Sequence, residues 1–383
     1  MKNKLMLTII FFLYMILLIL FLITKPSNVF NPKINSIDTY KQMEHFKINK
    51  EDSGIKHYAI LSVVHQYNPD SYKFATDTVH CYAHAYNYTY IVISMQNEPE
   101  LSKKCPQNDI MFSRHCYLAE YLEMHKEIDY ALFIDADTAV INPYHSLSEF
   151  SPKGNEEFLL YSRLFNYEIA CGSFFFKNSN YSRDLLKGFA NFYYKLPNSM
   201  HGTDNAAIQA YFLQKFVKNS FLEERTVCYK LWNRAQNWDD IWDFEACTKY
   251  ILEQASETPL SSDLLTFDNG KVVVVGKESK RRWIRDGPIT KNLFCEKDFL
   301  LHGYKGTQSS IKSTSVSNFI FDPESCINKP LRFLWRFKKN KVISCTERDF
   351  MISDIARETR EDFYRDLNDS GYLKKYKINK FFY

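Results

Sequence analysis

The 383-residue sequence lacks internal repeats and low-complexity blocks, and its charges are not segregated. Its net charge is +4, and the lysines and arginines are dispersed among the acidic residues. This distribution offers no basic face for a polyanion, so we expect no binding to nucleic acid. The chain beyond residue 24 is long enough for one large α/β domain with extensions, or for two domains.

Close CxxC spacing is also missing, so the nine cysteines do not predict a zinc site. All of them follow the apolar N-terminal segment, and a lumenal chain would expose them to disulfide-forming conditions. Because their number is odd, at least one must stay free or pair between chains, and the connectivity remains open. Three glycosylation triplets, at Asn87, Asn180 and Asn368, support a lumenal location.

Charged residues are absent from residues 5–24, which are rich in Leu, Ile and Phe and long enough to span a bilayer. No small-residue cleavage pattern follows them, so we predict an uncleaved signal-anchor. Lys2 and Lys4 place the N-terminus in the cytosol by the positive-inside rule. The alternative is a cleaved signal peptide. The predicted segments are a cytoplasmic tail (1–4), a transmembrane helix (5–24) and a stem (25–55).

The globular part begins with apolar runs that alternate with helical periodicity. This alternation predicts βαβαβ units and an α/β fold whose central sheet is mainly parallel. We expect the main domain at 56–310 and a C-terminal extension at 311–383. The predicted strands are 58–64, 88–94, 130–134, 157–163, 171–177 and 271–276, and the predicted helices are 70–86, 112–126, 181–195 and 204–216.

Two carboxylates one residue apart, Asp135 and Asp137, directly follow the predicted strand 130–134. A buried strand seldom ends in two acids without a cation to satisfy them. In an open α/β sheet, ligands gather beyond the carboxyl ends of the strands. Carboxylate oxygens suit Mn²⁺ or Mg²⁺, which keep positions open for phosphate oxygens. The pair therefore predicts a metal site that receives a nucleotide diphosphate. The alternative is a turn cap and a solvated acid.

His302 is the candidate third metal ligand, because imidazole is compatible with Mn²⁺ and Gly303 would let a phosphate approach closely. Lys305 could reach the diphosphate as a point charge. Arg114 is placed to meet phosphate or base. For both His302 and Arg114, a structural role in a loop or on a helix surface is the alternative.

Further candidates for substrate contact lie in two polar stretches. Gly172 and Ser173 interrupt an apolar strand, where a glycine permits close approach of a ligand or marks a bulge. His201 precedes Asp204 and Asn205 at a helix start. Asp204 could simply complement the helix dipole. In the functional interpretation, Asp204 and Asn205 are catalytic residues that face the transferred sugar, since one accepts and the other donates hydrogen bonds.

Four motifs in the same order, at 131–143, 163–173, 201–205 and 301–305, resemble a nematode-expanded family of nucleotide-diphospho-sugar transferases, formerly a domain of unknown function. That family is similar, more distantly, to retaining Golgi α-galactosyl-, α-mannosyl- and xylosyltransferases of the GT-A fold. The resemblance implies a GT-A-type, Rossmann-like fold. It also implies that Asp135, Asp137 and His302 hold Mn²⁺ and that Asp204 lies near the sugar.

These expectations describe a single-pass type II membrane protein of the Golgi or endoplasmic reticulum with a lumenal catalytic domain. It would transfer a sugar, with retention, from a UDP- or GDP-sugar to a glycan or glycoprotein acceptor. A catalytically silent protein of the same fold that binds glycans or a partner is the alternative. A sugar nucleotidyltransferase is disfavoured, because no Gly-rich basic loop follows the strand 58–64.

Overall fold

The computed structural model describes residues 56–306, 319–321, 323–326, 328–329, 331–369 and 371. They belong to one packed unit. The predicted cytoplasmic tail, transmembrane helix and stem lie outside the described residues. Within the described part of the chain, no helix combines the length and the apolar character needed to cross a membrane.

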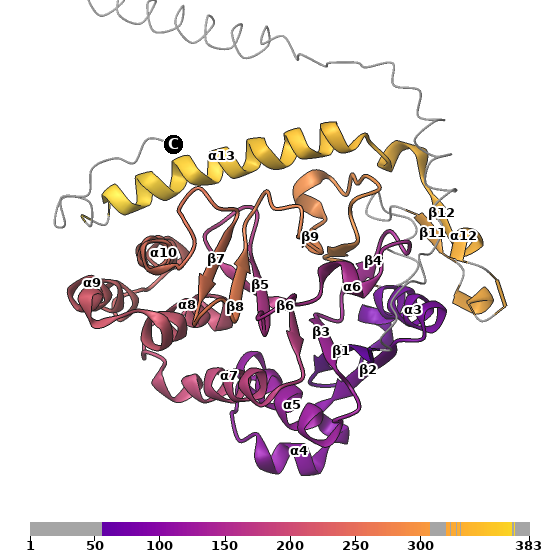
Figure 1. Ribbon diagram of the computed structural model, residues 1–383, viewed down its shortest axis with the longest axis horizontal. Helices are drawn as coiled ribbons and strands as arrows, with labels where there is room; N and C mark the ends of the chain where they lie inside the picture. Colours follow the sequence, from indigo (N-terminus) through magenta and orange to yellow (C-terminus); the bar gives the residue numbers. More distant parts are fainter. Residues whose placement is uncertain are drawn as a thin grey trace, which may run out of the picture. The chain divides into compact units, whose positions relative to one another are not determined.

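A seven-stranded sheet forms the centre of this unit (Figure 1). Three strand pairings are parallel and three are antiparallel. Five strands run in one direction, whereas β6 and β7 run in the other, so the predicted α/β sheet is mixed. Its order is β2 (Thr89–Ser94), β1 (Tyr58–Val64), β3 (Tyr130–Ile134), β6 (Ile169–Lys177), β5 (Phe158–Ser162), β8 (Val272–Val275) and β7 (Leu264–Phe267).

Helices cover the sheet, and their ends carry the expected signals. α3 starts after Asn68, whose side chain accepts a hydrogen bond from the Asp70 amide at 2.9 Å, and it ends at Asn87 in the left-handed region. α5 starts after Asp109, whose side chain caps the Met111 amide. The longer helices before residue 256 are α3 (Pro69–Tyr86), α5 (Ile110–Met124), α7 (Asn180–Asn191), α8 (Thr203–Phe216), α9 (Leu222–Trp232) and α10 (Trp238–Ala255).

Both faces of the sheet are buried, because alternate side chains of each strand enter different cores. In β3, Phe133 joins a core shared with α5, α7, α8 and α10. Leu132 joins a second core, with Phe74 of α3 and Leu301. A strand buried on both faces needs a continuous apolar run, which is why the run at 130–134 was recognisable.

A three-stranded sheet lies on the α3 side and was not predicted. β10 (Leu300–His302) is its central strand, antiparallel to β4 (Thr138–Val140) and parallel to β9 (Ile284–Asp286). His302 is therefore opposite both Thr138 and Asp286. These strands are only three residues long, so their own sequence carries little periodic signal.

Beyond residue 310 the described chain packs onto the domain. The long helix α13 (Cys345–Asp369) lies against α10, and its Phe363 and Leu367 enter the first core (Figure 1). The short elements are η1 (Met95–Asn97), α4 (Pro99–Lys104), α6 (Leu147–Phe150), η2 (Phe192–Lys195), η3 (Asn219–Phe221), η4 (Pro288–Thr290), β11 (Phe319–Phe321), η5 (Pro323–Ser325), α12 (Leu331–Leu334), β12 (Trp335–Phe337) and η6 (Lys339–Lys341).

Eight of the nine cysteines form disulfides, and the ninth, Cys171, is a buried free thiol. Burial raises the pKa of Cys171 well above its ordinary value, which keeps the thiol protonated and unreactive. The pairs are Cys81–Cys326, Cys105–Cys116, Cys228–Cys247 and Cys295–Cys345.

Candidate metal centre

The acid pair sits in a tight turn between β3 and β4. The Asp135 amide donates to the Gly172 carbonyl at 2.8 Å, and the Thr138 amide donates back to the Asp135 carbonyl at 2.9 Å. The turn lies at the carboxyl end of β3, as the sequence predicted. Both acidic side chains are part-exposed, so a ligand can reach them from solvent.

His302 meets this pair, because β10 pairs with β4 directly after the turn. Its Nε2 atom is 3.2 Å from Asp137 Oδ1 and 3.9 Å from Asp135 Oδ2. One ligand atom from each of the three residues lies within 4.8 Å of the other two. The structure thus brings together three residues that are distant in sequence and that were predicted to bind one metal.

A chain of charged groups behind His302 fixes the orientation of its ring. His302 Nδ1 is 3.0 Å from Asp286 Oδ1, and Asp286 accepts two hydrogen bonds from Arg163, at 3.0 and 3.2 Å. Arg163 also donates to Glu168 at 2.9 Å. A carboxylate on one imidazole nitrogen commonly sets the tautomer that presents the other nitrogen to a metal. Asp286 therefore leaves Nε2 facing the acid pair.

Asp286 was not among the site residues predicted from the sequence. Arg285 separates Asp286 from the two apolar residues Trp283 and Ile284, and the strand is only three residues long. That signal is too weak to recognise without the pairing of β9 with β10.

The charges around the centre shift its pKa values in opposite directions. Burial lowers the pKa of His302, but hydrogen bonds to Asp137 and Asp286 outweigh it and raise the pKa to about 10. Burial raises the pKa of Asp137, but the contact with His302 outweighs it and holds the pKa below its usual value. Burial raises the pKa of Asp135 despite the neighbouring Arg114. Three acids around one imidazole make this spot favourable for a cation.

The donor set fits the predicted metal. Two carboxylate oxygens and one imidazole nitrogen are ligands that Mn²⁺ accepts, and the oxygens also suit Mg²⁺. Nδ1 of His302 is already occupied by Asp286, so Nε2, which faces Asp137, is the nitrogen that can bind a metal.

Arg114 lies behind the acid pair and is almost completely buried. It donates to Asp135 at 2.7 Å, to Asp204 at 2.6 Å and to the Cys171 carbonyl at 3.2 Å. Burial lowers the pKa of Arg114, but the charges of Asp204 and Asp135 outweigh this effect and raise it. A guanidinium held by two carboxylates stays charged, so Arg114 anchors Asp135 from the protein interior.

Asp204 is fully buried rather than open to solvent. Its Oδ2 atom contacts Arg114 and His115 Nε2, and its Oδ1 atom has no hydrogen-bond partner among the described residues. Burial raises the pKa of Asp204, but the positive charge of Arg114 outweighs it and keeps the carboxyl ionised. Asn205, beside it, accepts from the Cys171 amide at 2.8 Å and donates to Glu168 at 3.2 Å.

Gly172 and Ser173 contact the site's framework. A Cβ atom at Gly172 would lie 2.5 Å from Asp135 Oδ2, so the absence of a side chain makes room for that carboxylate. Ser173 is fully buried, and its hydroxyl accepts a hydrogen bond from Trp283 Nε1 at 2.9 Å. The group that approaches Gly172 closely is therefore the Asp135 carboxylate, and not a bound ligand as the sequence suggested.

Of the remaining predicted residues, Gly303 and Lys305 lie beside the acid pair, whereas His201 contacts other parts of the domain. The Tyr304 amide donates to the Asp137 carbonyl at 2.8 Å, which keeps Gly303 and Lys305 beside the pair. Burial raises the pKa of Asp137, whereas His302 and, to a smaller extent, the exposed Lys305 lower it. His201 packs against Phe112, and its main-chain carbonyl accepts from Trp232 Nε1 at 3.1 Å.

The fold and the site together define the class: an α/β protein with a cluster of two carboxylates and an imidazole at the end of a strand. The chain belongs to DUF273, a family described as a protein of unknown function, whose model matches residues 79–319. This match agrees with the predicted membership in a family that was listed as a domain of unknown function. No curated protein matches the chain.

Two solved structures are distantly similar to the chain. One is a glycosyltransferase involved in the glycosylation of the major capsid of PBCV-1, with 11% identity, 67% of this chain and 100% of that chain covered, and a TM-score of 0.39. The other is A197 from STIV, with 12% identity, 41% and 76% covered, and a TM-score of 0.23. Both likenesses are too distant to indicate a function.

Proposed function

We propose that this protein is a glycosyltransferase that moves a sugar from a UDP- or GDP-sugar to a glycan or glycoprotein acceptor. The observation that carries the proposal is the convergence of Asp135, Asp137 and His302, with ligand atoms within 4.8 Å of one another, at the carboxyl end of β3. This is where an open α/β sheet gathers its ligands. Mn²⁺, or Mg²⁺, would be the cofactor, and it would neutralise the charge that develops on the departing diphosphate.

The protein's own residues have distinct roles in this proposal. Asp135, Asp137 and His302 bind the cation, while Asp286 holds the His302 ring in place. Arg114 acts through Asp135, because its guanidinium is buried and already paired. Lys305 is exposed beside the acids and adds positive charge toward the diphosphate.

In the proposed reaction, the residues at the start of α8 lie on the side of the transferred sugar. Asn205 is part-exposed and shares Glu168 with Arg163, so it links the sugar side to the chain that orients His302. Asp204 keeps Arg114 charged and in position. Gly172 and Gly303 leave room for close approach. Retention of the donor configuration and a contact of His201 with substrate belong to the same proposal.

We also propose a lumenal location, in the Golgi or the endoplasmic reticulum, for a type II protein anchored by residues 5–24. Four disulfides support an oxidising compartment. The three glycosylation triplets have exposed asparagines, at Asn87, Asn180 and Asn368.

The test is binding of UDP or GDP to the full chain with Mn²⁺, measured as the rise in unfolding temperature. The wild type is expected to be stabilised by nucleotide with Mn²⁺ and not by nucleotide with EDTA. Asp135→Asn/Asp137→Asn should abolish the rise, because the variant loses both carboxylate ligands.

The matched control is Glu223→Gln/Glu224→Gln, which removes two adjacent carboxylates at the start of α9. It should respond to nucleotide as the wild type does. An unchanged response in the Asp135/Asp137 variant would exclude the metal assignment. Release of UDP or GDP from a panel of nucleotide sugars then separates an active enzyme from a silent binding protein.

A further inference from the structure

A cavity of about 380 Å³ lies apart from the metal centre, and none of the three predicted metal ligands lines it. Its walls come from α10, α13, β7 with the loop before it, the end of β8, and the connection between β5 and β6. This volume is in the range of small-molecule binding sites. The residues that line it include Ser162, Tyr167, Lys249, Tyr250, Glu253 and Lys277.

The cavity combines aromatic rings with hydrogen-bonding groups. Tyr167 packs edge-on against Phe363 of α13, with ring centroids 5.4 Å apart, and Tyr250 contributes a third ring from α10. Ser162, Ser261 and Ser262 add hydroxyls, which both donate and accept. Aromatic surface with a few polar groups is typical of a site for a small polar ligand.

The charged side chains that line the cavity balance in sign: the cations are Lys249, Lys277 and Arg360, and the anions are Glu253, Asp263 and Glu278. Lys249 pairs with Glu253 at 3.1 Å, and Arg360 pairs with Glu278 at 3.8 Å. Lys277 donates to the carbonyls of Leu164 and Asn166, at 2.9 and 2.6 Å. An anionic ligand would have to compete for these cations, whereas a neutral ligand rich in hydroxyls would not.

One loop separates the cavity from the metal centre. Residues 163–168 connect β5 with β6, and the Arg163 amide donates to the Glu168 carbonyl at 2.9 Å. On one side, Arg163 holds Asp286 and through it His302. On the other side, the carbonyl of Leu164 accepts from Lys277 and Thr359 in the cavity wall. A ligand in the cavity would therefore rest against the loop that orients the metal site.

We propose that this cavity binds the distal part of the acceptor glycan, as a short neutral oligosaccharide. The inference rests on the proposed function, because a glycosyltransferase must hold an acceptor as well as the donor. The aromatic rings pack against the apolar faces of sugar rings, and the serine hydroxyls and Glu253 pair with sugar hydroxyls. α13 completes the site, which gives the C-terminal extension a role in acceptor choice.

The experiment uses the full chain, expressed with its disulfides, and neutral manno-, galacto-, xylo- and N-acetylchito-trisaccharides without nucleotide. Saturation-transfer NMR measures binding. At least one trisaccharide is expected to bind the wild type. Tyr250→Ala and Glu253→Ala should each weaken its binding by at least about tenfold, a loss of ~1.4 kcal/mol in affinity. Tyr194→Ala, which removes an exposed tyrosine on η2 away from the cavity wall, should not change it.

Two outcomes would overturn the proposal: no trisaccharide binds the wild type, or binding survives unchanged in both cavity variants. The Mn²⁺-dependent response to UDP or GDP should be retained in both variants, which shows that they are folded. Asp135→Asn/Asp137→Asn should still bind the trisaccharide. The acceptor site and the metal site can thus fail independently of each other.

Discussion

Three aspartates at the metal centre show how the surroundings give one residue type different roles. Asp137 faces His302 Nε2, Asp286 faces His302 Nδ1, and Asp135 is held by Arg114. Asp286 is the least exposed of the three and the one bound by Arg163. Its pKa is raised by burial, but hydrogen bonds from His302 and Arg163 outweigh burial and lower it far below the usual range. It is therefore a permanent anion suited to orient the ring rather than to bind the metal.

Asp286→Asn should weaken Mn²⁺ binding by about 10- to 100-fold, because the imidazole loses the carboxylate that sets its tautomer. Isothermal titration with MnCl₂ measures the change. Asp298→Asn is the matched control, since Asp298 is equally buried and paired with the adjacent Arg285 but does not contact His302. The control should lose stability and keep its Mn²⁺ affinity. Equal affinity of Asp286→Asn and wild type would contradict the positioning role.

At the scale of elements, the pairing of β3 with β6 explains the space around Asp135. Ile134 is opposite Ser173, so the residue after β3 meets Gly172. Only a residue without a side chain fits there, since a Cβ would come within 2.5 Å of Asp135 Oδ2. The pairing of two strands thus sets the position of a proposed metal ligand.

Gly172→Ala should displace the Asp135 carboxylate and strongly weaken the Mn²⁺-dependent nucleotide response. Steric overpacking of this kind costs about 1–3 kcal/mol of stability. Gly188→Ala on α7 is the control, because its Cβ would meet Tyr211 Oη at 2.4 Å, away from the metal centre. The control should lose comparable stability, measured by urea unfolding, without losing the nucleotide response. A normal nucleotide response in Gly172→Ala would argue against the role of this glycine.

The packing of α13 on α10 brings acids together. Burial and the charges of Asp366, Asp240, Asp369 and Asp239 raise the pKa of Asp243 to about 6. A carboxyl with a raised pKa in the folded state loses stability as pH rises from about 4 to about 6, and the full penalty remains above pH 6. At neutral pH this cluster therefore opposes the docking of α13.

Asp243→Asn should stabilise the protein at pH 7, by about 1 kcal/mol after allowance for solvent screening, and should have little effect at pH 4. Thermal unfolding at the two pH values measures the difference. Asp184→Asn, on the exposed surface of α7, should change stability by less than about 0.5 kcal/mol at either pH. Equal effects of Asp243→Asn at both pH values would refute the linkage.

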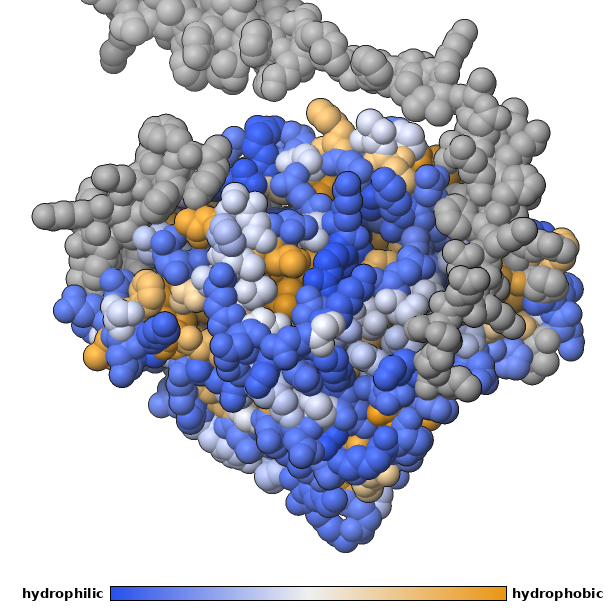
Figure 2. All heavy atoms as spheres, in the orientation of Figure 1, coloured by the Kyte–Doolittle hydropathy of each residue, from blue (hydrophilic) through white to orange (hydrophobic). Residues whose placement is uncertain are grey.

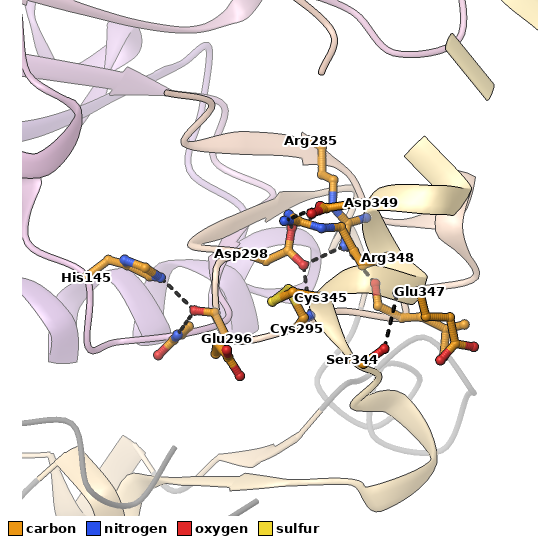
Figure 3. Close-up of a disulfide and its surroundings, with 12 residues drawn as sticks. His145, Arg285, Cys295, Glu296, Asp298, Ser344, Cys345, Glu347, Arg348 and Asp349 are labelled. Atoms are coloured by element: carbon orange, nitrogen blue, oxygen red, sulfur yellow. Dashed lines mark hydrogen bonds and ion pairs between the residues drawn. A yellow bond between two sulfur atoms is a disulfide. The ribbon is translucent and has the colours of Figure 1, made fainter. Parts of the chain in front are cut away.

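For the described unit as a whole, covalent and ionic links join the C-terminal segment to the site. Figure 3 shows the Cys295–Cys345 disulfide, with Arg285 of β9 and Arg348 of α13 both turned toward Asp298. Arg285 precedes Asp286, so the start of α13 is tied to the strand that orients His302. Figure 2 shows that the surface, in the orientation of Figure 1, is mainly hydrophilic with scattered hydrophobic patches.

Breaking the Cys295–Cys345 disulfide should cost more stability than breaking Cys105–Cys116. The sequence separations are 50 and 11, for which loop-closure entropy predicts ~4 and ~3 kcal/mol. The variants are Cys295→Ser/Cys345→Ser and Cys105→Ser/Cys116→Ser, compared by guanidinium unfolding. The first should also show faster amide exchange in α13. Slow exchange of α13 in that variant would mean that noncovalent packing alone holds the helix.

Local patterns were sufficient for elements with strong periodicity or capping. The structure has β1 at the residues predicted, and α3 and α5 within two residues of their predicted starts and ends. The acid pair after β3 was visible because a buried apolar run ended there. The mixed direction of the sheet could not be predicted, because β6 and β7 have the same apolar composition as parallel strands. Their direction depends on the strands beside them. The short strands β4, β9 and β10 were missed because three residues carry little periodic signal.

The amino-acid pattern alone established the α/β class, the acid pair and the three residues suited to one cation, because these follow from local burial and ligand chemistry. Tertiary structure was needed to pair β10 with β4 and β9, which brings His302 between Asp137 and Asp286. It also decided which cysteines bond and that Asp204 turns inward to Arg114. Such contacts join residues far apart in the chain, and their energies depend on neighbours that no local window of sequence contains.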